Sequence, residues 1–279
     1  MNVNPFVVPA SALVLLGAGF FLSAAAPPQK TRPRPAAVAV VAKPSPWVMT
    51  WHDEFNRSAV DATKWTVYDK AAEHNNELQY YAPDDVSIVN GCLRLTSEKR
   101  DFKGLQYTSG AVNSKGKFAQ AYGRFEARAK LPGTRGIWPA HWLLPGDGAW
   151  PPEIDIMELL GHEPTKVYLT NHWGADWKSH EHKGGSFGGP DFSRGFHTFA
   201  VEWEPGRVRW FVDGAARFES REGVPDKPFY VILNTAVGGD WPGKPDATTV
   251  FPQFHDIDYV RVYKRRGQPA PPTPTTPTR

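Results

Sequence analysis

The chain has 279 residues, of which 41% are hydrophobic and 13% aromatic, so it can bury a sizeable core as one large or two small domains. Its formal net charge is +3, but the two ends carry basic residues and no acid: Lys30, Arg32, Arg34, Lys43, Lys264, Arg265, Arg266 and Arg279. The body between them is mildly acidic, which argues against a nucleic-acid-binding groove. The single cysteine, Cys92, excludes an internal disulfide.

The first 26 residues are predicted to direct the chain out of the cytoplasm. An apolar run over 6–26 ends in small residues, Ala24 to Ala26, which is typical of a secretory signal peptide and its cleavage site. Residues 1–5 contain no lysine or arginine, however, and the run approaches the ~20 residues that span a bilayer. An uncleaved membrane anchor is therefore the alternative. Both interpretations predict a secreted, periplasmic or cell-surface protein.

Two further segments have compositions that disfavour packing. Residues 27–46 are rich in proline, alanine, valine and basic residues, and they are predicted to form an extended linker. Residues 267–279 contain five prolines and four threonines, and they are predicted to form a disordered tail. The folded domain is expected to span 47–266.

Short β-rich runs, separated by Gly, Pro, Asn and Asp clusters, fill this domain in sequence. They are predicted as strands at 47–51, 65–68, 78–81, 86–89, 93–97, 106–112, 122–131, 137–144, 153–159, 166–172, 196–202, 208–212, 216–218, 230–236 and 257–263. No helical period stands out. The pattern predicts an all-β fold, an antiparallel sandwich of two sheets, in which one curved sheet offers a concave cleft.

The run from Glu153 to Glu158 places three acids inside an apolar strand. Alternation puts Glu153 and Asp155 on one face, but strict alternation would send Glu158 into the core. A bulge at Ile156-Met157 would return Glu158 to the acid face. Three neighbouring carboxyls raise one another's pKa, so one can stay protonated while another is ionised.

A protonated carboxyl beside an ionised one is what cleavage of a glycosidic bond requires. The alternative is an edge strand whose acidic face is only solvated. The chain's eleven tryptophans favour the sugar interpretation, because six lie near the acidic strand or in Gly/Pro-rich loops and flat rings suit sugar faces. Those six are Trp138, Trp142, Trp150, Trp173, Trp177 and Trp241.

Several motifs in order resemble glycoside hydrolase family 16, in its bacterial laminarinase branch. They are WHDEF at 51–55, NNELQYY at 75–81, YGRFEAR at 122–128, GIWPAHWLLP at 136–145, EIDIME at 153–158, NTAVGGDWPG at 234–243 and DYVRVY at 258–263. The resemblance implies a concanavalin-like β-jelly-roll catalytic domain. It also implies a retaining mechanism, with Glu153 as nucleophile, Asp155 as its assisting carboxylate and Glu158 as acid/base.

Further residues are candidates for substrate contact. Trp138 and Trp142 are four apart on one strand and hence on one face, which the resemblance turns toward the cleft; core packing is the alternative. The other candidates follow the next strand or lie in segments that resemble cleft walls: His172, Trp173, Asn76, Asn234 and Trp241. The run His180-Glu181-His182 could suggest a metal, but a flexible glycine-rich polar loop is the preferred interpretation, since no third ligand follows at a recognisable spacing.

The resemblance also implies a structural calcium on the convex face, held by Glu54, the carbonyl of Gly91 and Asp258. The alternative is that Asp258 pairs with a neighbouring side chain. No cofactor is expected for catalysis.

The expected activity is that of a secreted, endo-acting β-glucanase on β-1,3- or mixed β-1,3/1,4-glucan, working as a monomer on a polysaccharide. Trp150-Pro151-Pro152 directly precedes Glu153, where laminarinases have a glycine and a longer loop. The same chemistry on a galactan of the agarose or carrageenan type, or transglycosylation, is therefore an alternative. A lectin-like binding module without turnover is disfavoured, because none of the three acids is missing.

Overall fold

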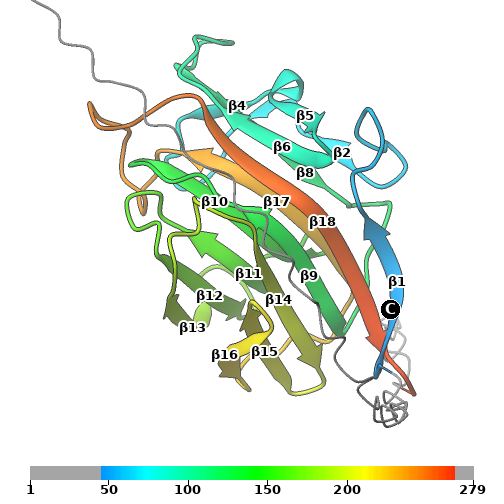
Figure 1. Cartoon of the computed structure of the whole chain (residues 1–279). Coiled ribbons are helices and arrows are strands. Elements are labelled where there is room, and N and C mark those ends of the chain that lie inside the picture. The colour runs from blue at the N-terminus through cyan, green and yellow to red at the C-terminus, as the bar shows by residue number, and fades with distance from the viewer. Residues whose placement is uncertain (1–44, 268–279) are drawn as a thin grey trace, which may run out of the picture. The chain divides into compact units, whose positions relative to one another are not determined.

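The computed structural model describes residues 45–267, which form β-strands and one short 3-10 turn, η1 (Pro83–Asp85). Most strands belong to two antiparallel sheets that stack face to face (Figure 1). This confirms the predicted all-β sandwich of two sheets. The predicted signal peptide or anchor, nearly all of the linker and nearly all of the tail lie outside the described residues. Within 45–267, no helix is long and apolar enough to cross a membrane.

The first sheet has the strand order β16-β15-β14-β9-β18-β6-β5, and β1 also pairs with β18. Its strands are β16 (Ala215–Ser220), β15 (Arg207–Val212), β14 (His197–Glu204), β9 (Gly123–Lys130), β18 (Gln253–Arg265), β6 (Cys92–Ser97), β5 (Val86–Val89) and β1 (Trp47–Asp53). Side chains of β9 alternate between buried small or aromatic residues and outward-facing charges. This pattern is expected for a sheet with one face on the core and the other in solvent.

The second sheet has the order β13-β12-β11-β10-β17-β8-β2. Its strands are β13 (Glu181–Gly188), β12 (Lys166–Trp173), β11 (Glu153–Leu159), β10 (Ile137–Pro145), β17 (Phe229–Val237), β8 (Ala111–Asn113) and β2 (Thr66–Val67). A small third sheet joins β3 (Lys70–Ala71), β4 (Gln79–Tyr81) and β7 (Tyr107–Ser109). The predicted strand at 106–112 is thus two strands in different sheets, β7 and β8, separated at Gly110.

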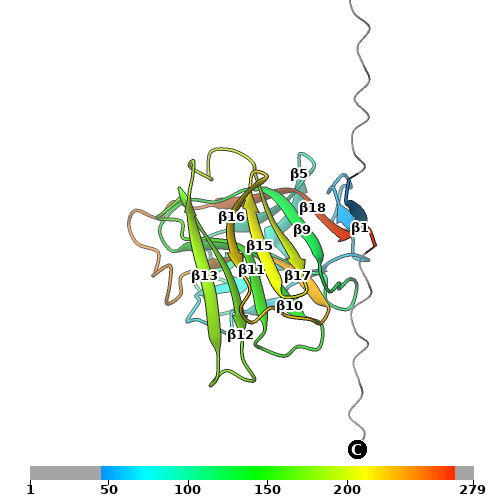
Figure 2. The ribbon, with the colours of Figure 1, turned by 90° about the horizontal axis from the view of Figure 1, so that it is seen from below.

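Strand β13 corrects the sequence prediction of a loop at this position. Its backbone pairs with β12 along its whole length, from Glu181 opposite Trp173 to Gly188 opposite Lys166. The strand lies beside β16 of the first sheet (Figure 2). A Cβ atom at Gly185 would lie 2.6 Å from the Phe218 ring, so glycine permits this close approach. The glycine-rich composition therefore reflects packing at a sheet edge.

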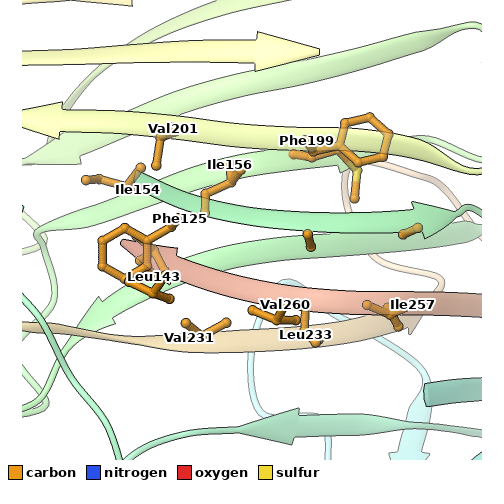
Figure 3. Packing of buried hydrophobic residues seen from close by; sticks show 14 of the residues in the cluster. Phe125, Leu143, Ile154, Ile156, Phe199, Val201, Val231, Leu233, Ile257 and Val260 are labelled. Carbon is orange, nitrogen blue, oxygen red and sulfur yellow. The ribbon is translucent and has the colours of Figure 1, made fainter. Parts of the chain in front are cut away.

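The core lies between the two sheets and is built from alternate residues of the central strands. Phe125 and Val201 of the first sheet lie with Leu143, Ile154 and Ile156 of the second (Figure 3). All five side chains are fully buried. Full burial of such a side chain contributes roughly 1.5–3 kcal/mol, so this layer fixes the position of β11 against the first sheet.

Two histidines lie inside this apolar layer. His141 of β10 and His255 of β18 are buried, and the Nδ1 atom of His255 lies 3.3 Å from the hydroxyl of Thr235. Among the described residues, neither ring nitrogen of His141 has a hydrogen-bond partner. The Nε2 atom of His255 also has none there. Burial lowers the pKa of His141 to about 3 and that of His255 to about 4, so both rings are neutral in the folded protein.

These histidines should make folding stability depend on pH. Below pH 6.5 they take up protons in the unfolded chain but stay neutral in the folded one, so stability falls as the pH falls toward about 4. From pH 6.5 to about pH 5, each should remove about 2 kcal/mol of unfolding free energy. The substitution His141→Phe should cancel one of these two contributions. Urea unfolding of both proteins at several pH values measures the difference, and identical pH slopes would contradict the assignment.

Candidate active site

A bulge in β11 brings the three acids to one face of the second sheet. On the β10 side, Asp155 and Met157 face adjacent residues, Trp142 and His141, so Ile156 has no partner. On the β12 side the pairing moves from Asp155 directly to Glu158. The predicted bulge at Ile156-Met157 is therefore present, and both of its side chains point into the core.

The bulge is also tied to the first sheet. The indole Nε1 atom of Trp210, from β15, donates to the backbone carbonyl of Asp155 at 2.7 Å. A bulge leaves backbone groups without ladder partners, and an unpaired buried carbonyl is costly. Trp210 satisfies this one from across the core, which fixes the strand where its side chains change direction.

The central acid, Asp155, is almost completely buried, and its main polar contact is a histidine of β12. The Nε2 atom of His172 lies 2.9 Å from Asp155 Oδ2 and 3.8 Å from Glu153 Oε1. Burial lowers the pKa of His172, so its ring is neutral and offers one N–H group. Burial, followed by the charge of Asp155, raises the pKa of the neighbouring Glu153, so the two carboxyls do not readily ionise together.

The two glutamates each accept a hydrogen bond from a tryptophan. Trp138 Nε1 donates to Glu158 Oε1 at 3.0 Å, and Trp150 Nε1 donates to Glu153 Oε2 at 3.0 Å. These bonds stabilise the ionised form of each acid and restrict its rotamers. Each working carboxyl is thereby held by the indole N–H of a tryptophan.

Burial and mutual repulsion raise the pKa of all three acids. The pKa of Glu158 is raised to about 8 by desolvation and by the charge of Glu153. The pKa values of Glu153 and Asp155 are raised well above their usual range, first by desolvation and then by the neighbouring acid. At neutral pH the group therefore keeps protons, with Glu158 as a proton donor.

A cavity of about 440 Å³ opens beside Glu158. It is lined by Glu158, Tyr168, Thr170, His172, His182, Gly184, Gly185, Ser186 and Trp241. Aromatic and imidazole rings with glycine backbone form its walls, so a flat polar ring can lie against them while Glu158 reaches its oxygen atoms.

Two of the predicted substrate-contact residues, His172 and Trp241, line this cavity. Trp241 is 40% exposed, and its ring packs edge-on against Trp138 at 5.5 Å and against Tyr168 at 4.7 Å between ring centroids. Trp142 and Asn234 are not among its lining residues. Trp142 Nε1 donates to Asn234 Oδ1 at 2.8 Å, and Asn234 Nδ2 donates to the hydroxyl of Tyr81 at 2.9 Å.

Asn76 lies in the loop before β4, where its Nδ2 atom donates to both carboxylate oxygens of Asp240, at 2.9 and 3.1 Å. Asp240 directly precedes Trp241, so this bond ties the loop to the segment that carries that ring. In this structure Asn76 acts on the cleft through Trp241, and its direct contact with substrate stays a prediction.

Trp173 is a correction to the predicted set. Alternation along β12 places His172 on the cleft face with Tyr168 and Thr170, so Trp173 faces the other side. There its ring packs tightly on Gly223, which has a φ of +56°. Trp173 therefore does not line the cleft with His172. The two residues are adjacent in sequence, but their side chains point to opposite faces of the sheet.

Three cleft residues were missed as site residues by sequence reasoning. Tyr168 is four before His172 on β12, so alternation alone could have placed it on the cleft face. Trp150 is one of the six tryptophans that favour a sugar site and part of the departure from the laminarinase pattern, but its contact with Glu153 was not predicted. His182 lies opposite His172 on β13, and it was missed because this segment was predicted as a loop.

Oxygen atoms of Glu153 and Asp155 and a ring nitrogen of His172 lie within 4.8 Å of one another, a spacing that could also suit a cation. His172 Nε2 already lies within hydrogen-bond distance of Asp155, and the raised pKa of Glu153 keeps a proton in the cluster. These two features account for the close spacing of the three groups without an ion.

The residues predicted to bind calcium do not fit that role in this arrangement. Both oxygens of Glu54 accept from Arg261, at 2.9 and 2.7 Å, and Asp258 Oδ2 accepts from Arg128 at 2.5 Å. An arginine thus balances each carboxylate, which matches the alternative in which Asp258 pairs with a neighbour. The predicted third ligand, Gly91, lies in the turn between β5 and β6.

A β-sandwich that presents paired, proton-sharing carboxyls in an aromatic cleft defines a glycosidase of the acid/base type. Comparison with known proteins gives the family. Residues 59–261 match the family model of the glycosyl hydrolases family 16. The chain belongs to this family.

Similar proteins include one named beta-glucanase from Rhodothermus marinus, 38% identical over 252 residues, covering 78% of this chain and 85% of the relative. A glucan endo-1,3-beta-glucosidase A1 from Niallia circulans is 35% identical, and the match covers 78% of this chain but only 38% of that relative. The crystal structure of the laminarinase catalytic domain from Thermotoga maritima superposes with a TM-score of 0.73 at 39% identity, covering 79% of this chain and 99% of that one.

The substitution Trp138→Phe should move the alkaline limit of activity upward. Hydrolysis requires protonated Glu158, so activity should fall above pH about 8. Loss of the indole donor destabilises ionised Glu158, and a hydrogen bond to a charged group is worth about 1.5–3 kcal/mol, or roughly one to two pH units. The pH profile of kcat/KM measures this shift. Trp142→Phe is the control, because Trp142 donates to Asn234. If the alkaline limit of activity stays at the wild-type pH in Trp138→Phe, the role of Trp138 is contradicted.

Chelation should leave the melting temperature unchanged, because arginines already balance Glu54 and Asp258. Differential scanning calorimetry with and without EDTA tests this. A fall of several degrees that added calcium reverses would restore the predicted calcium site.

Proposed function

We propose that this chain is an endo-acting β-glucanase that hydrolyses β-1,3- or mixed β-1,3/1,4-linked glucan with retention of configuration. The observation that carries the proposal is the pair of glutamates, Glu153 and Glu158, which stand on either side of the bulge and each accept a hydrogen bond from a tryptophan. The names of the similar proteins support a glucan as the substrate class.

In the first step, Glu158 donates its proton to the glycosidic oxygen while Glu153 attacks the anomeric carbon. The bond to the leaving sugar breaks as a glycosyl ester with Glu153 forms. Asp155 keeps the shared proton during this step, which leaves the negative charge on Glu153 for the attack. His172 and Trp150 donate hydrogen bonds toward these two acids and hold them in place.

In the second step, Glu158 is ionised and acts as a base, removing a proton from water that attacks the glycosyl ester. The products are a shortened glucan and free Glu153, with Glu158 protonated again. Burial supports both roles, because desolvation makes Glu158 a stronger base than a solvated carboxylate.

The open cavity beside Glu158 supports attack within a chain, since its walls of Trp241, Tyr168 and His182 leave space for sugars beyond the scissile bond. The apolar run at 6–26 supports action outside the cytoplasm, where polysaccharide is met. The proposed enzyme works as a monomer, and the site that it uses is assembled from strands and loops of one chain, so the proposed chemistry calls for no second copy.

The substitutions Glu153→Gln and Glu158→Gln should each abolish hydrolysis while the fold and glucan binding remain. Loss of general acid catalysis alone should lower turnover roughly 100- to 10,000-fold. Glu219→Gln, on the first sheet and away from the cleft, is the matched control. Near-normal turnover by either active-site variant would discard the mechanism.

Substrate choice is measured by incubating the wild-type protein with laminarin, lichenan, agarose and carrageenan and sizing the products. Oligosaccharides of several lengths early in the laminarin or lichenan reaction are expected for an endo-acting glucanase. Products from agarose or carrageenan alone would move the substrate class to galactans, and products longer than the substrate would show that transglycosylation dominates.

A further inference from the structure

His180 packs against two residues, His172 and Trp150, that contact the acids on the nucleophile side of the site. It lies directly before β13, and its half-buried ring packs between two others. The ring centroids are 5.1 Å from His172, at an interplanar angle of 19°, and 4.9 Å from Trp150. These two neighbours are the residues whose ring nitrogens lie within hydrogen-bond distance of Asp155 and Glu153. One ring therefore supports both donors.

The first link is a chain of hydrogen bonds. His172 Nδ1 and His180 Nε2 are 2.8 Å apart, and His172 Nε2 is 2.9 Å from Asp155 Oδ2. A neutral imidazole has one N–H and one acceptor nitrogen. If His172 donates from Nε2 to Asp155, its Nδ1 must accept, and His180 must donate from Nε2. His180 thus selects the tautomer in which His172 can serve Asp155.

The second link is ring packing on Trp150. Trp150 is 44% exposed, so few other side chains fix the direction of its indole. Its Nε1 atom nevertheless reaches Glu153 Oε2 at 3.0 Å. A side chain this exposed samples other rotamers unless a neighbour restrains it. The imidazole of His180 covers one face of the indole and keeps the donor aimed at Glu153.

His182 differs from His180 in this respect. Its ring lies 5.7 Å from His172 and 5.8 Å from His180, but no hydrogen bond joins it to either among the described residues. Only His180 therefore combines a hydrogen bond to His172 with packing against Trp150.

We propose that His180 is a positioning residue for the nucleophile Glu153, acting through the tautomer of His172 and the orientation of Trp150. It lies behind both donors and needs no contact with the sugar. This inference rests on the proposed function, because its kinetic effect requires turnover of a glucan. It also makes a structural prediction for His172 that requires no substrate.

Three variants separate the two links. His180→Phe keeps a ring against Trp150 but removes the donor to His172. His180→Gln keeps an N–H donor near the same place but removes the ring, and His180→Ala removes both. On laminarin or lichenan, kcat should fall about 10-fold in His180→Phe and further in His180→Ala, with a smaller change in KM. His180→Gln should recover part of the kcat lost in His180→Ala. His162→Phe, at an exposed histidine in the turn after β11, is the matched control.

Nitrogen-15 NMR of the histidine rings provides the second readout. Wild-type His172 should show a protonated Nε2 and an unprotonated Nδ1. The His180→Gln variant should keep this pattern, whereas His180→Phe should give a mixture of tautomers. This readout distinguishes positioning from a general loss of stability, which thermal melts of each variant record separately.

The outcomes are distinct. Wild-type kcat in His180→Phe, or an unchanged His172 tautomer in that variant, would overturn the inference. Equal losses in all three variants that follow their melting temperatures would also overturn it, by showing a structural role alone. If the wild-type protein is inactive on both glucans, the proposed function fails, and the NMR pattern of His172 still decides whether His180 sets its tautomer.

Discussion

The active site depends on one extra residue in the middle of a strand. Without the bulge at Ile156-Met157, the period of two would place Glu158 among the core side chains, where an ionisable group would face apolar neighbours. With the bulge, Ile156 and Met157 both enter the core and the third acid returns to the cleft. The bulge is stabilised by burial of these two side chains and by the Trp210 donor, which reaches it from across the core. The same bulge therefore fills the core and places the acids in the cleft.

The electrostatics of the site follow from that placement. Three carboxyls on one buried face cannot all ionise, and the site distributes protons by giving each acid a different partner. Glu158 has Trp138, Glu153 has Trp150, and Asp155 has His172. These donors come from β10, from the loop before β11 and from β12, so neighbouring segments on both sides contribute to the environment of the acids. The partners restrain the acids while desolvation keeps their pKa values high, which a solvated acidic strand could not do.

The two histidine groups illustrate opposite uses of one side chain. His141 and His255 lie in the apolar core and are neutral because charging them there would be costly. His172 and His180 lie at the cleft edge and are joined through their ring nitrogens. For the two that stand on strands of the second sheet, His141 of β10 points into the core, whereas His172 of β12 points to the cleft. The same alternation separates Trp173 from the cleft, although it is the next residue after His172.

The sequence alone determined the strand content, the two-sheet arrangement and the acid trio with its bulge, because alternation and the position of charged residues are local signals. It predicted that Trp138 and Trp142 share a face for the same reason. Only the tertiary structure decided what those residues contact. The donor to Glu158, the β13 strand in place of a loop, the direction of Trp173 and the arginine partners of Glu54 and Asp258 all depend on other segments of the chain. Glycine and polar residues carry little local preference for a strand, so pairing with β12 and packing on Phe218 determine the conformation there.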